Sequence, residues 1–370
     1  MTVSTSVLVR YEELREFVAQ VFSAHEVPGA RAATAAEALC YGDLTGLNSH
    51  GVANLSRLYL PLFEQARVQP RAELEVVADR GAAALVDAHY ALGLWAASEA
   101  MDMAMHRAAT YGVGMISVRA ATHFGCAGHH AARAVRRDMV GLVAANCGRQ
   151  RIARPPGGRV AMLGTNPLSI AAPAGKHPPF ILDMSTTAVP TGKIRAAARA
   201  GRTVPEGWLA DDQGNPVIDP AAFDRGDAHL LWLGGTGAGI HKGFGLGVMV
   251  EVLAALIPGA GLGPDTDALA GNGQPCGRDD DIGFFVAAIA PDALRPSGDV
   301  RRDAQTLFGT LLACPAACDD SPVRYAGWHE AQQARVHRRN GVALTEALYQ
   351  ELCEIAGKLK IRMPAPIGAR

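Results

Sequence analysis

The sequence predicts a mixed α/β fold with a helical lobe at its N-terminus. Apolar residues recur at helical spacing in 11–24, 32–44 and 53–67, and Pro61 predicts a kink in the third of these stretches. After Pro70 the pattern changes to short β-rich runs that alternate with helices. Several of these runs are joined by short turns, which predicts that part of the sheet is antiparallel.

The elements after residue 70 follow from the same patterns. A run rich in apolar residues predicts a strand, and apolar positions three and four residues apart predict a helix. The predicted strands span 74–78, 83–87, 113–118, 141–145, 169–172, 180–184 and 282–289. The predicted helices span 95–111, 127–137, 244–256, 304–312 and 344–356. The stretch 258–278 is rich in Gly, Pro and Asp and is expected to be an exposed loop.

Composition narrows the class of protein. The 370 residues are 49% hydrophobic and 19% charged, which suits a globular protein with more than one lobe. The net charge of −1 gives no attraction to nucleic acid or to an anionic membrane. Glycines, Pro258 and Glu251 interrupt the apolar stretch 243–263, so a buried helix is expected there rather than a membrane span. Seven cysteines without a paired spacing, and the lack of a secretory signal, predict a cytoplasmic protein.

The usual dinucleotide-binding fingerprint is absent from the sequence. A Rossmann site needs Gly-x-Gly-x-x-Gly between a strand and a helix. Residues 235–239 and 243–247 contain alternating glycines, but the third glycine is missing at the required spacing. A nicotinamide enzyme with this sequence is therefore expected to bind its cofactor with another fold.

Four short motifs carry residues suited to catalysis or ligand binding. The first is Ser49-His50-Gly51 between two predicted helices, and the second is His123-Phe124-Gly125 after a predicted strand. The third joins Gly164-Thr165-Asn166 to Asp183-Met184-Ser185 and then to Gly192-Lys193. The fourth is His241-Lys242-Gly243, which opens the apolar helix that carries Glu251.

This set of motifs, in this order across nearly the whole chain, resembles the type-2 malate/L-lactate dehydrogenase family. That family also includes sulfolactate and ureidoglycolate dehydrogenases, diketogulonate reductase and the piperideine/pyrroline-2-carboxylate reductases. The resemblance implies a non-Rossmann fold with a mixed sheet, NAD or NADP as cofactor, a small-molecule substrate and a homodimer. It also implies three regions: a helical lobe over 1–72 packed with C-terminal helices in 300–370, a substrate and dimerisation sheet region over 73–120 and 225–300, and a nicotinamide-binding region over 121–224.

The resemblance implies which residues transfer a proton. Reduction of a carbonyl or an imine leaves charge on oxygen or nitrogen, so a donor with a pKa near neutrality is needed, and histidine suits this role. In the family pattern His50 is the proton donor, oriented by Ser49. His123 is the second catalytic residue, because some members use it as the proton acceptor. The alternative for His50 is a loop histidine that caps the helix beginning near Val52.

The resemblance also implies the ligand contacts. The Gly-rich turn after His123 offers backbone N–H groups to a phosphate or an amide, and Asp183 ends a strand, a usual place for ligand contact. The alternative for Asp183 is an N-cap of the following segment, and for Lys242, one of five lysines, a solvated side chain. The expected cofactor-binding residues are His123, Phe124, Gly125, Cys147, Asp183, Met184, Ser185, Lys242, Gly243, Gly327 and Trp328. The expected substrate-binding residues are Asn54, Arg57, Thr165, Thr187 and Lys193.

Cys126, His129 and His130 lie close to His123 in the sequence, which raises the alternative of a metal site. Their spacing matches no known zinc pattern, and the resembling family carries aromatic residues at the positions of His129 and His130. No metal is therefore expected. Glu251 is expected to be a buried carboxylate with a structural role.

Two positions depart from the family pattern. Many relatives have an arginine at the position of Asn54 and another at Thr191, and these arginines hold the substrate carboxylate. Losing such a clamp commonly costs on the order of a hundredfold in affinity, which argues against malate or lactate as substrate. Arg57, Arg195 and Arg199 are alternative anchors for the carboxylate.

Lys193 stands where the cyclic imine reductases often have an acidic residue, which favours the hydroxy-acid branch of the family. The leading expectation is an NAD(P)-dependent oxidoreductase that transfers a hydride between nicotinamide and a small 2-oxo acid or 2-hydroxy acid. The alternatives are a cyclic imine reductase, a non-redox binding protein, and a metal-dependent hydrolase that uses His123, His129 and His130.

Overall fold

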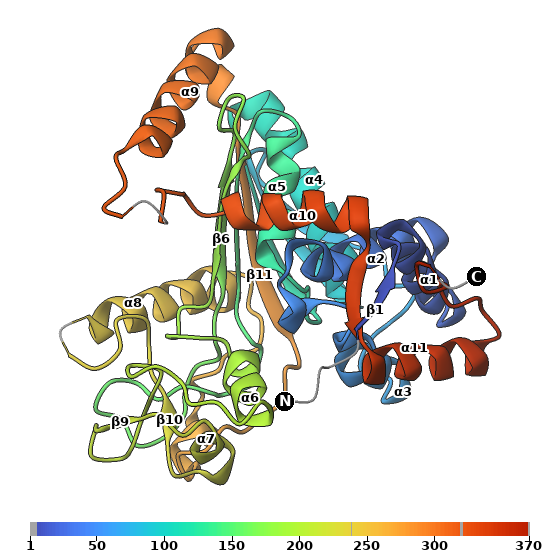
Figure 1. Ribbon diagram of the computed structural model, residues 1–370. Helices are drawn as coiled ribbons and strands as arrows, with labels where there is room; N and C mark the ends of the chain where they lie inside the picture. Colours follow the sequence, from blue (N-terminus) through green and yellow to red (C-terminus); the bar gives the residue numbers. More distant parts are fainter. Residues whose placement is uncertain (1–5, 238, 319–320, 369–370) are drawn as a thin grey trace.

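A computed structural model describes residues 6–237, 239–318 and 321–368 of the chain (Figure 1). A sheet seen nearly edge-on stands in the middle, with a helical lobe on one side and a smaller lobe below the other side. None of the described helices is long and apolar enough to cross a membrane. The fold is therefore mixed α/β, as the sequence predicts.

The helical lobe joins the two ends of the described chain. The predicted first two helices are confirmed as α1 (Tyr11–Ala24) and α2 (Gly29–Thr45). Strand β1 (Ser6–Val9) pairs antiparallel with β12 (Val342–Thr345), which brings α11 (Glu346–Leu359) against α1. Helix α10 (Trp328–Asn340), which the sequence analysis missed, packs on α2.

Two predicted helices of this lobe were wrong in detail. The continuous helix over 53–67 is instead a π-helical turn, η2 (Leu55–Tyr59), followed by the short helix α3 (Leu60–Glu64). The π-helical turn leads directly into α3, since Tyr59 has helical dihedral angles and the Leu60 N–H donates to the Leu55 carbonyl, so the irregularity predicted at Pro61 takes the form of a π-helical turn just before it. The helix predicted from residue 344 begins at Glu346, because residues 342–345 pair with β1.

The central sheet has seven strands in the order β2-β3-β4-β11-β5-β6-β7. Only β3 and β4 run parallel among these described pairs, so the predicted antiparallel component is confirmed. The last of these seven strands in sequence, β11, lies between β4 and β5 with residues buried on both faces. All seven predicted strands are present, as β2 (Glu75–Asp79), β3 (Ala83–Ala91), β4 (Val113–Ala121), β5 (Val140–Ala145), β6 (Leu168–Ala172), β7 (Phe180–Met184) and β11 (Ile282–Ile289).

Strand direction brings several chain ends to one edge of the sheet. Strand β11 is antiparallel to both β4 and β5, so β4 and β5 point the same way, and two further antiparallel pairings give β7 that direction too. The carboxyl ends of β4, β5 and β7 therefore meet at one edge. The amino ends of β6 and β11 lie at the same edge.

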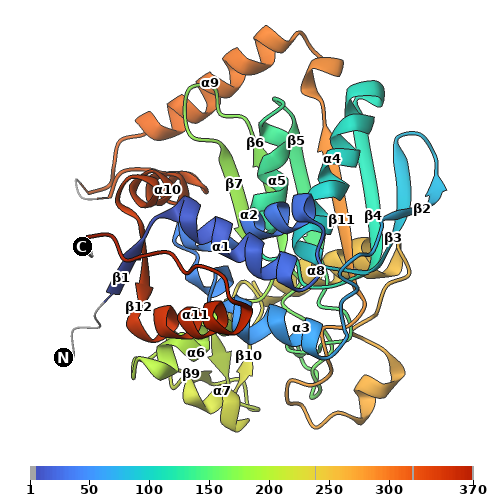
Figure 2. The same cartoon turned by 90° about the vertical axis from the view of Figure 1, so that its right-hand side faces the viewer.

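Helices cover both faces of the sheet. Helices α4 (Gly93–Tyr111) and α5 (Ala127–Val135) pack on the face toward the helical lobe. The other face packs against α8 (Ile240–Glu251) and the π-helical turn η3 (Val252–Leu256), where Val250 and Ala254 contact Ala144. Helix α9 (Ser297–Ala313) crosses the far end of the sheet (Figure 2).

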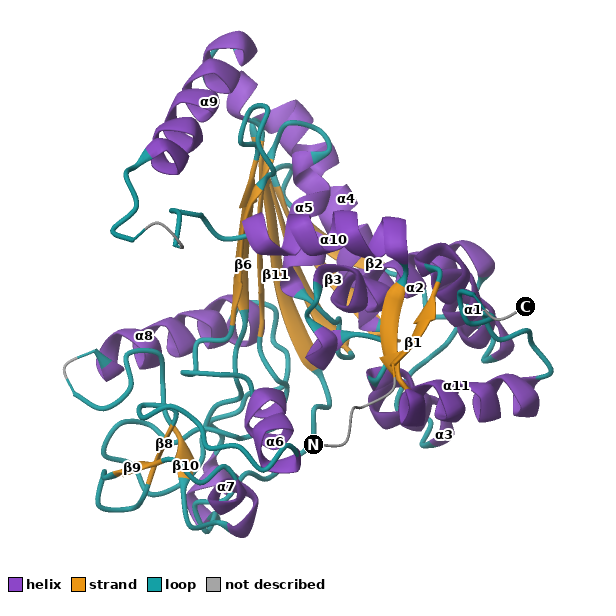
Figure 3. Cartoon of the chain, in the orientation of Figure 1, coloured by secondary structure: helices purple, strands orange, loops and turns teal. Residues whose placement is uncertain are grey.

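The smaller lobe was not predicted, because its strands are only two residues long. It contains mainly loops around a three-stranded sheet (Figure 3). Its elements are α6 (Thr191–Arg199), β8 (Leu209–Ala210), β9 (Pro216–Val217), α7 (Ala221–Arg225) and β10 (His229–Leu230). A small apolar core that includes Ile194, Leu209 and Phe223 holds it together.

The prediction of an exposed loop over 258–278 was wrong in part. Ala260 and Ala268 of this segment are buried. The side chain of Arg151 donates to the Gly263 carbonyl at 2.8 Å, and Arg154 donates to the Gly273 carbonyl at 2.9 Å. Glycine-rich composition predicted a lack of regular structure here, but it did not predict that buried arginines would bind the segment's carbonyls.

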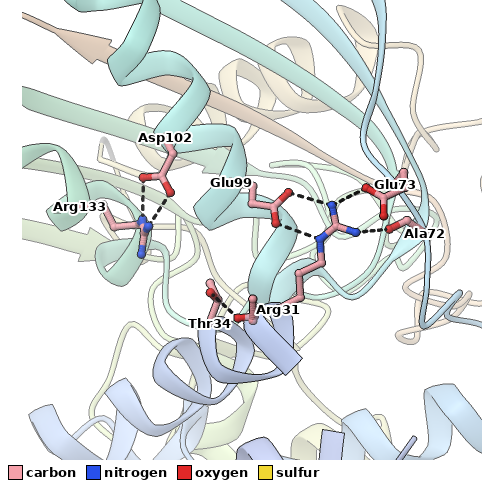
Figure 4. A network of polar contacts seen from close by, with 8 residues as sticks. Arg31, Thr34, Ala72, Glu73, Glu99, Asp102 and Arg133 are labelled. Carbon is pink, nitrogen blue, oxygen red and sulfur yellow. Dashed lines mark hydrogen bonds and ion pairs between the residues drawn. The ribbon is translucent and has the colours of Figure 1, made fainter. Parts of the chain in front are cut away.

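Arg31 of α2 joins the helical lobe to the sheet (Figure 4). Its guanidinium donates to Glu99 of α4 at 2.9 Å, to the Ala72 carbonyl at 2.8 Å and to Glu73 at 2.7 Å. The guanidinium also lies 4.0 Å from the centre of the Trp95 ring. The Arg31 side chain is only 15% exposed, so its contacts with Glu99 and the Ala72 carbonyl are partly shielded from solvent, whereas Glu73 is 78% exposed.

Replacing Arg31 with alanine is expected to destabilise the protein strongly. The change leaves Glu99 and the Ala72 carbonyl without their donor, so we expect the free energy of unfolding to fall by about 2–4 kcal/mol. Arg136→Ala is the matched control, since Arg136 also pairs with α2, through Glu37 at 2.8 Å, but is 62% exposed. The control should change stability by at most about 0.5 kcal/mol. Urea unfolding measures both, and equal losses would contradict the prediction.

Candidate active site

The edge where β4, β5 and β7 end carries a cavity of about 460 Å³ between the sheet, the helical lobe and the smaller lobe. This volume lies within the usual range for small-molecule sites. The predicted site residues that line it are Ser49, His50, His123, Phe124, Gly125, Cys147, Thr165, Asp183, Met184, Ser185, Thr187 and Lys193. The topology thus brings residues from three of the four sequence motifs into one cavity.

The loop that carries His50 is held in place by Asp43. Gly46 ends α2 in the left-handed conformation, with φ of 80°. The buried Asp43 carboxylate then accepts a hydrogen bond from the Val52 N–H at 2.7 Å and fills the space where a side chain on Gly51 would lie. The alternative that His50 caps this turn was therefore wrong, because Asp43 does so.

His50 has the environment of a neutral imidazole. Its Nδ1 lies 2.9 Å from the Ser49 hydroxyl. Burial lowers the pKa of His50 below its ordinary value of 6.5, and the nearby charges of Arg57 and Lys193 lower it further. The neutral ring therefore predominates at pH 7, which suits a group that accepts a proton and returns it.

His123 follows β4 and is fixed as one tautomer. The Gly125 N–H, which can only donate, points at His123 Nδ1 at 3.2 Å, so this nitrogen is an acceptor. The Tyr59 hydroxyl, 2.8 Å from the same nitrogen, then also donates to it. Burial, together with the charge of His50, lowers the pKa of His123 to about 4. The neutral ring therefore carries its proton on Nε2, which is free to donate to a ligand.

The two histidines lie side by side. Their ring centres are 6.2 Å apart, and the ring planes differ by 22°. His50 comes from the helical lobe and His123 from the sheet, so the pair depends on how these two parts pack. Burial disfavours a charge on either ring, and a charge on His50 lowers the pKa of His123 further.

Asp183 ends β7 and connects it to the start of α5. Its carboxylate accepts the Gly128 N–H at 2.7 Å, and burial raises the pKa of Asp183 to about 6. The alternative that Asp183 caps the segment following it was wrong, since it caps a helix 55 residues earlier in the chain. The strand end nevertheless places Asp183, Met184 and Ser185 on the cavity wall.

Glu251 is a buried structural carboxylate, as predicted, and it binds loops next to the cavity. It accepts hydrogen bonds from Asn146 at 3.3 Å, from Asn166 at 2.8 Å and from the Gly263 N–H at 2.8 Å. Burial raises the pKa of Glu251, and these donors offset part of that rise. Asn146 and Asn166 adjoin Cys147 and Thr165, so Glu251 fixes two loops that line the cavity.

The remaining predicted residues do not line this cavity. Lys242 and Gly243 lie in the first turn of α8, where the Lys242 side chain is exposed. Gly327 and Trp328 begin α10 beside β7, where the Ala326 carbonyl accepts the Ile181 N–H at 3.0 Å. Their cofactor contacts stay predictions.

Asn54 and Arg57 also lie outside the cavity wall, just behind the His50 loop. Asn54 is buried and donates to the Ser49 carbonyl at 3.0 Å. The Arg57 side chain is exposed and donates to Asn54 Oδ1 at 2.6 Å. Asn54 therefore positions the loop, and substrate contacts of Asn54 and Arg57 stay predictions.

Sequence reasoning missed several residues of the site. Tyr59 contacts His123, and Gln150, Trp208, Leu233 and Asp279 line the cavity. Asp279 lies in a run of charged residues that is typical of a solvated loop. Trp208 follows Pro205 and Gly207. A large aromatic residue in such a loop is the one feature of the sequence that could have indicated a ligand contact.

The neighbouring histidines of α5 belong to the protein interior. His130 contacts Ser98 at 3.0 Å and the Phe124 carbonyl at 2.8 Å, and His129 packs edge-on against Tyr41. Across the described residues, no group of three or more histidine, cysteine or carboxylate side chains is arranged to bind a metal. The hydrolase alternative therefore gains no support from this region.

Comparison with known proteins agrees with this geometry. The family model described as malate/L-lactate dehydrogenase matches residues 9–353. An L-sulfolactate dehydrogenase of Methanocaldococcus jannaschii is 29% identical over 356 residues, covering 96% of this chain and 98% of the relative. A Δ1-pyrroline-2-carboxylate/Δ1-piperideine-2-carboxylate reductase of Pseudomonas putida is 28% identical over 354 residues, covering 96% and 98%.

A solved structure gives the same result. The malate dehydrogenase of Entamoeba histolytica superimposes with a TM-score of 0.88 at 26% identity, covering 98% of this chain and 100% of that one. The predicted non-Rossmann fold and the family resemblance are thus confirmed. The chain belongs to the malate/L-lactate dehydrogenase family and is an oxidoreductase.

Proposed function

We propose that this protein transfers a hydride between NAD or NADP and the C2 atom of a small 2-oxo acid or 2-hydroxy acid, with His50 as proton donor and acceptor. The observation that carries the proposal is the pair of neutral histidines, His50 and His123, in the cavity at the sheet edge where β4, β5 and β7 end. Oxidation of an alcohol or reduction of a ketone needs one group that exchanges a proton near neutrality. His50 meets this requirement.

The residues around the cavity fit a nicotinamide ring. Phe124, Met184 and Ile282 offer apolar contacts to its faces, and Asp183 and Ser185 offer polar groups to its carboxamide. When bound, the cofactor supplies or accepts the hydride. At the amino end of α5, which follows the Gly125 turn, the Gly128 N–H is already bound by Asp183, so the carboxylate and not this N–H faces the cofactor.

The chain's own residues then handle the proton. In the reductive direction His50 donates a proton to the oxygen formed at C2, and in the oxidative direction the neutral ring removes the hydroxyl proton. The Ser49 hydroxyl holds Nδ1, so Nε2 is the nitrogen left for the substrate. His123, protonated on Nε2, donates a hydrogen bond that orients the bound ligand.

A cyclic imine reductase is the second candidate, favoured by the similarity to the Pseudomonas putida reductase. It would use the same cavity and the same proton donor. A panel of 2-oxo acids and Δ1-piperideine-2-carboxylate, each assayed with NADH and NADPH, separates the two activities. Cofactor binding without turnover of any compound would instead support a non-redox binding protein.

Replacing His50 tests the proposed proton transfer. His50→Ala should leave cofactor affinity nearly intact and lower turnover by roughly a hundredfold to ten-thousandfold, since a general acid–base group is lost. His123→Ala should weaken cofactor binding as well as turnover, because its turn lines the proposed nicotinamide site. Fluorescence titration with reduced cofactor measures binding, and steady-state assays measure turnover.

The pH profile of the unaltered enzyme gives the second half of this test. Oxidation needs the neutral His50 ring and reduction needs the protonated ring. Because the pKa of His50 is lowered, the rate of oxidation should increase with increasing pH and reach its plateau below pH 6.5, and the rate of reduction should decrease over the same pH interval. The His50→Ala enzyme should lack this transition. Near-normal turnover with an unchanged profile would show that another group moves the proton.

A contact between Lys242 and the cofactor is a separate prediction. Lys242 begins a glycine-rich helix, where an ammonium group and backbone N–H groups attract a phosphate or a ribose. Lys242→Ala should raise the dissociation constant of the reduced cofactor at least about tenfold, as loss of a charged hydrogen bond does. Lys358→Ala, on the exposed surface of α11, is the control. An unchanged dissociation constant would remove Lys242 from the site.

We also propose a homodimer that uses the surface of α8 and η3. Apolar side chains are exposed along this segment and the loop after it, at Val248, Met249, Val252, Leu256, Ile257 and Leu262. A contiguous apolar surface of this kind is typical of a subunit interface. Lys242, the proposed cofactor contact, lies at the start of α8. A partner subunit bound along α8 would therefore also lie near this contact.

Leu256→Glu is expected to shift the protein toward monomers. The charge would be buried without a partner in the proposed interface, which costs several kcal/mol. Leu307→Glu on α9 is the control, since Leu307 is also exposed, at 57%, but lies far from α8. Sedimentation velocity at micromolar concentration measures the change, and a fully active monomeric wild type would refute the proposal.

A further inference from the structure

The charges around the cavity are unusual for an enzyme that acts on a dianion. Among the described residues that line it, Lys193 is the one side chain with a permanent positive charge. Two carboxylates, Asp183 and Asp279, line the same cavity. Arg67 neutralises Asp279 from outside, at 2.6 Å, and is itself shared with Asp280.

None of the alternative anchors Arg57, Arg195 and Arg199 lines the cavity, and Arg199 is exposed near the end of α6. Arg195 pairs with Asp224 at 3.0 Å in the smaller lobe. Arg57 is turned toward Asn54 behind the His50 loop and does not line the cavity. Of the wall residues that the structure describes, Lys193 is therefore the one cation that a ligand in the cavity meets.

Lys193 lies where it can hold a carboxylate next to the reacting carbon. It is in the first turn of α6, and a side chain on Gly192 would lie 3.5 Å from Ser49, so this turn packs beside the His50 loop. In a 2-oxo acid the carboxylate carbon and the carbonyl carbon are bonded to each other. A carboxylate on Lys193 therefore brings the carbonyl close to His50.

The smaller lobe gives the cavity an apolar wall. Ala188 donates its N–H to Leu231, and Leu231 donates to Trp208, so these segments lie side by side. Together they present Val189, Pro190, Trp208 and Leu233 to the cavity. Trp208 and Leu233 are partly exposed to solvent, so a bound ligand could cover their remaining apolar surface.

We infer that the substrate is a monocarboxylate whose side chain is apolar, branched-aliphatic or aromatic, with Lys193 binding the carboxylate and the wall formed by Val189, Pro190, Trp208 and Leu233 binding the side chain. This inference rests on the proposed function and adds the substrate class. A second carboxylate or a sulfonate would be desolvated against this wall without a cationic partner, which is unfavourable. Malate-like and sulfolactate-like substrates are thereby disfavoured.

Equilibrium binding tests the inference without turnover. Calorimetric titration, with saturating oxidised cofactor present, compares phenylpyruvate and 4-methyl-2-oxopentanoate with oxaloacetate and sulfopyruvate. The two apolar compounds should bind at least about tenfold more tightly than the two dianions, the scale of one unpaired charge. Equal or tighter binding of the dianions would overturn the inference.

Steady-state kinetics with reduced cofactor distinguishes this result from failure of the proposed function. Turnover that favours oxaloacetate or sulfopyruvate would overturn the substrate class and leave the oxidoreductase proposal standing. Absence of turnover with every 2-oxo acid, alongside tight binding of phenylpyruvate, would support the substrate class and refute the proposed reaction.

Two variants test the assigned residues. Lys193→Gln should raise the dissociation constant of phenylpyruvate about tenfold or more, whereas Lys358→Gln should leave it unchanged. Leu233→Arg adds a cation to the wall and should improve oxaloacetate binding relative to 4-methyl-2-oxopentanoate by about tenfold, with Leu307→Arg as the control. Unaltered binding in Lys193→Gln, or unaltered selectivity in Leu233→Arg with circular dichroism showing a folded protein, would overturn the assignment.

Discussion

The position of strand β11 is the constraint on which the site depends. This strand comes late in the chain but lies between β4 and β5, and its close packing under η3 requires Gly283, where any side chain would meet the Ala254 carbonyl. Because β11 is antiparallel to both neighbours, β4 and β5 must end at the same edge of the sheet. His123 and Cys147 therefore reach one cavity although they lie 24 positions apart in the sequence.

Burial controls the electrostatics at that edge. Both histidines lose hydration and lie beside one another and beside cations, so the pKa of each is lowered and both rings are neutral near pH 7. Asp183 experiences the opposite effect, since burial raises the pKa of a carboxyl. The two rings therefore add no charge to the cavity near pH 7, and among the described residues that line it the ammonium of Lys193 is the one permanent positive charge that an anion meets.

Sequence patterns predicted elements better than they predicted contacts. All seven strands of the sheet were found, because each is an apolar run bounded by turns. The strands β8, β9 and β10 were missed because two residues carry no periodicity. Helix α10 was missed because it has no buried residue and hence no apolar stripe. The loop over 258–278 was assigned as exposed because its burial depends on arginines that lie far away in the chain.

The sequence by itself determined the fold class, the family and the residues Ser49, His50, His123, Asp183 and Lys193 that come together, since local motifs and periodicity are encoded in short segments. Only the tertiary structure decided what these residues do to one another. The tautomer of His123 depends on Gly125 and Tyr59, and the turn at Gly51 depends on the carboxylate of Asp43. The apolar wall with Trp208 and Leu233, and the pairing of Arg195 with Asp224, likewise arise from residues distant in sequence, because hydration and charge depend on neighbours in space.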